Sequence, residues 1–108
     1  MKSEETIVAD LKLEGYDNVY AWDAPPDEIE EEHEHPFETK LVIVAGEMRI
    51  NVLRVDKMED FTLHPGQEIE INRGERHNAT AGPEGCRYVV GEMQLTTRWK
   101  RLAKGYKL

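Results

Sequence analysis

The sequence HEHPFETKLVIVAG, residues 33–46, places two histidines two positions apart, followed by a run of branched apolar residues that ends at a glycine. Valine and isoleucine favour extended backbone, so this run predicts a β-strand, with Gly46 as a turn signal after it. Side chains at positions i and i+2 of a strand lie on one face, so we expect His33 and His35 to point the same way. Two imidazoles on one face can bind a single metal ion, but they can equally be a solvated polar face.

Outside this stretch the sequence alternates short apolar segments with glycine, proline and asparagine turns, which predicts an antiparallel sandwich or barrel. Ser3 before two glutamates, and Gly15 after an amphipathic run, predict one helix over about 3–14. We expect a single domain over 1–108, with the barrel at about 18–94 and a basic tail at about 95–108. The expected strands are 18–24, 28–35, 40–45, 47–55, 61–63, 68–71, 77–81 and 86–95.

The composition excludes several classes of protein. A formal charge of −8 repels phosphate, which argues against nucleic-acid and membrane binding. The chain contains no apolar block of the roughly 20 residues that a membrane span needs, and its first residues lack the features of a secretory signal. Cys86 is the only cysteine, so no intrachain disulfide can form. We therefore expect a soluble, cytoplasmic protein.

Charge is unevenly distributed along the chain. Eight acidic residues and no basic one lie between Asp23 and Glu38, whereas the last eleven residues contain five basic residues and no acidic one. Both segments can be solvated surface. Alternatively, the tail docks on an acidic face of its own subunit or of a partner.

The two histidine-containing segments together resemble the two motifs of a small single-domain cupin, a double-stranded β-helix or RmlC-like jelly roll. His33, His35 and Gly46 match the first motif, G(X)5HXH(X)3,4E(X)6G, and Gly66, Gly74 and His77 match the second, G(X)5PXG(X)2H(X)3N. The resemblance covers about residues 18–94. It implies an all-β cupin barrel in which His77 joins His33 and His35 as the third ligand of one metal ion.

The sequence departs from these motifs at four positions: Asp27, Thr39, Asn72 and Ala81. Thr39 matters most, because it occupies the position of the metal-binding glutamate. Glu38 is a candidate fourth ligand, but on a regular strand it would point away from the histidines unless a bulge turned it inward. Glu31 shares the parity of His33 and is a weaker candidate for a supporting position.

Three neutral imidazoles suit one divalent transition metal, either Zn, Fe, Ni or Cu, and leave coordination positions open. We therefore expect a metal-dependent enzyme, dioxygenase-, isomerase- or hydrolase-like, that acts on a small organic molecule. Two alternatives stay open: a non-catalytic metal- or ligand-binding or sensing module, and a metal-free structural barrel. Within the family, fold alone does not choose between them.

For most of the remaining buried, aromatic and basic residues, a structural role is the simplest interpretation. We expect Ile43, Met48 and Ile50 on the inner wall, and His64 and Cys86 outside the site. Several large side chains can line a ligand cavity or pack the core: Tyr20, Trp22, Phe37, Phe61, Tyr88 and Met93. Arg49 and Arg54 can bind a carboxylate, although arginines on strands usually face solvent.

An exposed edge at 18–24 predicts a homodimer.

Overall fold

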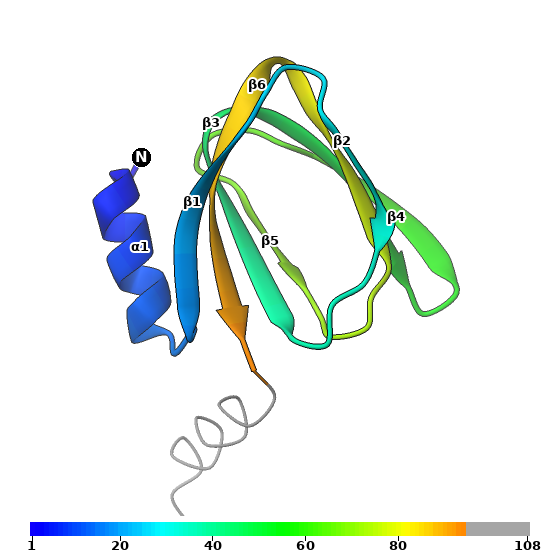
Figure 1. The fold of residues 1–108 in the computed structure, drawn as a ribbon, viewed down its shortest axis with the longest axis horizontal. Coiled ribbons are helices and arrows are strands. Elements are labelled where there is room, and N and C mark those ends of the chain that lie inside the picture. Colours follow the sequence, from blue (N-terminus) through cyan, green and yellow to red (C-terminus); the bar gives the residue numbers. More distant parts are fainter. Residues whose placement is uncertain (95–108) are drawn as a thin grey trace, which may run out of the picture.

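The computed structural model describes residues 1–94, so the predicted basic tail lies outside the described residues. The elements in chain order are α1 (Glu4–Leu13), β1 (Asn18–Ala24), β2 (Ile29–His33), β3 (Glu38–Arg54), β4 (Lys57–Leu63), β5 (Glu68–Ile71) and β6 (His77–Met93) (Figure 1). All strand pairs are antiparallel. This confirms the predicted all-β jelly roll with one short N-terminal helix.

Two long strands, β3 and β6, form the frame of the barrel. They pair with each other from Glu38↔Met93 to Val52↔His77, and each contributes to two layers. One layer has the order β1-β6-β3-β5 and the other has the order β2-β6-β3-β4 (Figure 1). The sequence analysis was wrong to divide each long strand in two. Irregularities between Ile43 and Met48 bend β3 at the predicted turn without interrupting it.

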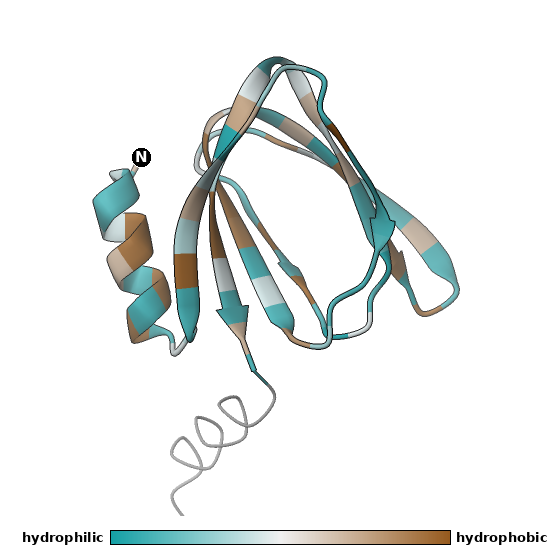
Figure 2. Cartoon of the chain, viewed as in Figure 1, coloured by the Kyte–Doolittle hydropathy of each residue, from teal (hydrophilic) through white to brown (hydrophobic). Residues whose placement is uncertain are grey.

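Because successive side chains of a strand point to opposite faces, the strands form an inner and an outer hydrophobic core. Figure 2 shows hydrophobic (brown) and hydrophilic (teal) residues interspersed along the strands. Ile43, Met48 and Ile50 are buried in the inner cluster, as predicted. On the outer face, Val42 and Val89 pack against Ile7 and Leu11 of α1. The helix therefore covers one layer and leaves the interior to the strands.

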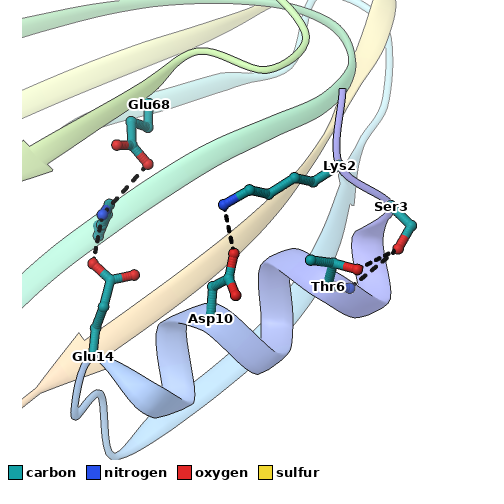
Figure 3. A network of polar contacts seen from close by, with 7 residues as sticks. Lys2, Ser3, Thr6, Asp10, Glu14 and Glu68 are labelled. Atoms are coloured by element: carbon teal, nitrogen blue, oxygen red, sulfur yellow. Dashed lines mark hydrogen bonds and ion pairs between the residues drawn. The ribbon is translucent and has the colours of Figure 1, made fainter.

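Polar contacts fix α1 to the sheet. Ser3 caps the helix by accepting a hydrogen bond from the Thr6 backbone N–H. Lys40 is buried, and its Nζ lies 2.8 Å from Glu14 Oε1 and 3.4 Å from Glu68 Oε2, between the two carboxylates drawn in Figure 3. Arg87 of β6 binds Glu4 through two nitrogens, at 2.6 and 3.0 Å.

Among residues 1–94, no helix is long and apolar enough to cross a membrane.

Gly46, the last glycine of the first motif, is required at a point where the backbones of β3 and β6 lie very close together. Its φ is +79°, and a Cβ there would lie 2.1 Å from the carbonyl oxygen of Gly85 on β6. Gly66 has a similar φ of +88°, but a Cβ there would meet only the Met1 side chain at 3.5 Å. The two glycines therefore share backbone strain on substitution but not the backbone clash.

We predict that Gly46→Ala lowers the free energy of unfolding by about 3 kcal/mol or more, because the clash with Gly85 forces the β3–β6 crossing apart. The matched variant Gly66→Ala should cost only about 1 kcal/mol, the strain of a left-handed alanine. Urea denaturation of both variants measures the difference. Equal losses would show that the close approach to Gly85 does not constrain the fold.

Candidate metal centre

Three histidines from two distant parts of the chain meet inside the barrel. The pairing of β2 with β6 puts His33 directly opposite His77, and His35 follows in the loop after β2. Their ligand nitrogens all lie within 4.8 Å of one another. The ring centroids are 4.2 Å apart for His33 and His77, 4.7 Å for His33 and His35, and 5.1 Å for His35 and His77.

Backbone carbonyls orient two of the three rings. His33 Nδ1 donates to the Glu31 carbonyl oxygen at 2.7 Å, and His77 Nδ1 donates to the Glu75 carbonyl oxygen at 2.9 Å. A neutral imidazole that donates through Nδ1 carries its lone pair on Nε2. Metal-bound histidines are held in this way by outer hydrogen bonds, so the donor set fits a transition-metal ion.

The third ring is positioned by stacking. His35 lies on Phe37, with ring centroids 4.9 Å apart and planes 10° from parallel. Its Nε2 is 3.2 Å from Nε2 of His33. This aromatic support gives Phe37 a structural role beside the centre.

Burial favours the neutral form of two of the rings. It lowers the pKa of His35, and the neighbouring His33 and His77 lower that pKa further. Burial also lowers the pKa of His77, against an opposing effect of its hydrogen bond to the Glu75 carbonyl. Because neutral imidazole is the metal-binding form, burial favours metal binding by these two rings.

Glu30 supplies a carboxylate that the sequence analysis did not consider for the site. Its Oε1 lies 3.0 Å from His33 Nε2. One extra residue between Glu30 and His33 forms a bulge in β2, so Glu30 pairs with Ala79 while His33 pairs with His77. Ala79 belongs to the inner core, and Glu30 shares its face.

His33 Nε2 therefore lies close to two other atoms that accept protons or metals: Nε2 of His35 at 3.2 Å and Oε1 of Glu30 at 3.0 Å. Since Nδ1 of His33 is engaged by the Glu31 carbonyl, either a proton on Nε2 or a metal ion can satisfy this arrangement. Such a cluster is stabilised by a cation between its members. This is the chemical property that distinguishes the cluster from three histidines on a solvated face.

The structure does not bring the candidate ligand Glu38 into this group. Its carboxylate accepts a hydrogen bond from the Arg73 backbone N–H at 3.2 Å, outside the histidine cluster. Thr39 is buried and faces inward, opposite Ile71 and Glu92 of the neighbouring strands. Glu31 supports His33 through its main-chain carbonyl, while its side chain is exposed.

The other candidates lie away from the cluster. His64 is exposed, with Nε2 3.8 Å from Glu47. Cys86 is buried, and burial raises the pKa of its thiol to about 11, which keeps it protonated and unreactive. Arg49 is exposed, and Arg54 pairs with Glu59 and Glu75.

One physical cause explains why Glu30 was not predicted as a site residue. Strict alternation places Glu30 and His33 on opposite faces, and only the bulge reverses this relation. No residue between Ile29 and His33 is a glycine or another sign of a bulge, so the sequence contained no local signal for it. Strict alternation instead favoured the neighbouring Glu31, which shares the parity of His33.

Comparisons with known proteins identify the fold. Neither models of protein families nor curated protein sequences match the chain. Among solved structures, the cupin domain of Drosophila melanogaster CENP-C is similar with a TM-score of 0.65 and 20% identity, over 68% of this chain and 55% of that one. The same protein has also been solved bound to CAL1.

Two larger proteins match over more of this chain. A variant of oxalate decarboxylase from Bacillus subtilis has a TM-score of 0.69 and 17% identity, over 82% of this chain and 24% of that one. Vicilin from Solanum lycopersicum (tomato) has a TM-score of 0.66 and 22% identity, over 80% of this chain and 25% of that one. The chain thus spans about a quarter of these two proteins and about half of the CENP-C chain. At these identities the likeness concerns the fold, and the protein has the cupin fold that its two motifs indicated.

Proposed function

We propose that the protein binds one divalent transition-metal ion through His33, His35 and His77, with Glu30 as the fourth donor. The observation that carries this proposal is the convergence of the histidine ligand nitrogens while Nδ1 of His33 and His77 is engaged by carbonyls. Three imidazoles and one carboxylate suit Zn, Fe, Ni or Cu. The Glu30 carboxylate also supplies a negative charge in place of the motif glutamate, whose position Thr39 occupies.

The finer proposal is that the bound ion acts on a small organic molecule. Four protein donors leave positions at which an ion of higher coordination number can hold a ligand, and the ion would there supply Lewis-acid or redox chemistry. A non-catalytic binding module is the second candidate, supported by cupin-fold neighbours such as vicilin and the CENP-C domain in complex with CAL1. Turnover measured on metal-loaded protein separates the two.

The predicted homodimer stays a prediction. β1 lies at the end of its layer and pairs only with β6 among residues 1–94, so its outer edge is available to a second copy.

His77→Ala should abolish stoichiometric metal uptake, because the variant loses the ligand that fixes the cluster to β6. We expect wild-type protein reconstituted with Zn or Fe(II) to retain about one equivalent after desalting, and the variant to bind at least about 100-fold more weakly. His64→Ala is the control. Since His77 is buried, circular dichroism must show a folded variant, and His35→Ala provides a second test if it does not. Wild-type protein without metal after reconstitution would refute the proposal.

Glu30→Gln should weaken metal binding about tenfold, because glutamine keeps the shape of the side chain but removes the charge beside the cation. Glu31→Gln, next in sequence, should leave affinity unchanged, since only the main chain of Glu31 supports the site. Isothermal titration of both variants measures the contrast. Equal affinities would leave a three-histidine centre.

Metal affinity should be nearly constant around neutral pH and fall as the solution is acidified below about pH 6.5. Burial lowers the pKa of His35 and His77, so protons begin to displace the metal only below the pH at which an ordinary imidazole titrates. Affinity measured from about pH 8 to about pH 5 gives the onset. A loss already under way between about pH 8 and about pH 7 would contradict this assignment of neutral rings.

A further inference from the structure

Aromatic residues of β1 and β6 form a second feature on the inner face of the barrel. Tyr20 pairs with Val90, and Trp22 pairs with Tyr88. Val90 belongs to the inner core and Tyr88 packs against it, so these aromatic side chains share the inward face. We call the set formed by Tyr20, Trp22, Thr39, Tyr88 and Glu92 the aromatic–acid patch.

Solvent reaches this patch although its residues face inward. Trp22 is 52% exposed and Tyr20 is 38% exposed, whereas Val90 beside them is 5% exposed. Large aromatic surfaces left open on an inner face are available to a ligand. Their faces also attract organic cations, because the ring quadrupole is negative there.

Glu92 gives the patch a charge that no cation within residues 1–94 neutralises. Its carboxylate accepts hydrogen bonds from Asn18 Nδ2 and from the Tyr20 hydroxyl, both at 2.9 Å. These neutral donors hold the carboxylate in place. No lysine or arginine of residues 1–94 forms an ion pair with Glu92. Five of these basic residues pair with other acids: Lys2, Lys40, Arg54, Arg76 and Arg87. The other four are exposed: Lys12, Arg49, Lys57 and Arg73.

Thr39 provides an independent sign of a polar ligand. It is 5% exposed, and its Oγ1 has no hydrogen-bond partner among the described residues. It lies directly opposite Glu92 in the β3–β6 pairing, hence on the same face. A buried hydroxyl without a partner costs free energy, which a ligand with a donor group would recover.

The patch lies in the same electrostatic environment as the histidines. The carboxylates of Glu30 and Glu92 both act on the pKa of His35, and Glu30 also acts on the pKa of Tyr20 and Tyr88. The patch and the histidines therefore lie within the field of the same carboxylates. With two carboxylates at its inner face, the barrel disfavours an anionic group at this position.

We propose that the aromatic–acid patch binds the ammonium group of a small organic cation, against Glu92 and the faces of Trp22 and Tyr20. The proposal deepens the proposed function, because the rest of such a ligand would extend toward the metal centre. Ammonium binding itself does not require the ion, so it can be tested on metal-free protein.

The test uses the full chain, stripped of metal with a chelator, and benzylammonium as the probe, because its N–H groups can donate to the Thr39 hydroxyl. Its neutral isostere, ethylbenzene, and the anion benzoate are the matched ligands. The readout is the indole N–H signal of Trp22 in a heteronuclear NMR spectrum, distinguished from that of the second tryptophan, Trp99, by its loss in Trp22→Leu. We expect this signal to shift with the cation and not with benzoate.

Variants then assign the two contributions by calorimetric titration of the same probe. Glu92→Gln should weaken binding roughly tenfold, because it removes the charge while an amide oxygen can still accept from Tyr20. Trp22→Leu should weaken it about threefold, and Trp22→Phe less. Glu5→Gln, an exposed acid on the outer helix with the same charge change, should have no effect.

Three outcomes would overturn the proposal: no binding at millimolar probe, equal binding of the neutral isostere, or full affinity in Glu92→Gln. Occupation of the patch by a basic side chain of residues 95–108 or by a second copy would appear as the first of these. Metal uptake by the same protein is measured separately, so loss of ammonium binding leaves the metal proposal intact. The converse result, binding without metal uptake, would refute only the metal centre.

Discussion

The antiparallel pairing of β2 with β6 is the constraint on which the candidate site depends. It sets His33 opposite His77 at one rung of the ladder and Glu30 opposite Ala79 at the next, with one extra residue between them. Strand pairing fixes positions to within a fraction of a residue, because a slip of one would turn every side chain to the other face. Strand pairing therefore positions His33 and His77, while His35 is held by the loop that follows β2.

The barrel separates its charges by location. Two cations on the outer faces are matched with acids: Lys40 under the helix and Arg87 between α1 and β1. On the inner face, Glu30 lies beside the His33 ring and Glu92 beside the Tyr20 hydroxyl. An interior with this negative charge is a poor environment for anions and a favourable one for metal ions and organic cations. Two of the acidic residues that make the chain negative, Glu30 and Glu92, thus lie on the inner face, where their charge affects which ligands can bind.

Much of the fold could be predicted from the sequence, because alternation and turn residues report strands directly. The motif resemblance implied that His77 would join His33 and His35, and Ile43, Met48 and Ile50 are inside as expected. Strand ends were less predictable: Gly46 looked like a turn, yet it lies within a bent continuous strand, where positive φ is compatible with pairing through a bulge. The three histidines could be named from the spacing of the two motifs. The proposed fourth donor, Glu30, could not, since alternation fails where a bulge adds a residue and no side chain in the glutamate run marks its position.

The bulge in β2 also bears on how such a site can change over evolutionary time. Removing one residue between Glu30 and His33 would remove the bulge and leave the two residues two positions apart, so Glu30 would still share the inner face with His33. Loss of the bulge without a change of length would instead put Glu31 opposite Ala79 and turn Glu30 outward. Because residues 30–32 are all glutamates, a carboxylate would face the histidines in both cases. The glutamate run thus keeps a negative charge at this position when the strand changes by one residue.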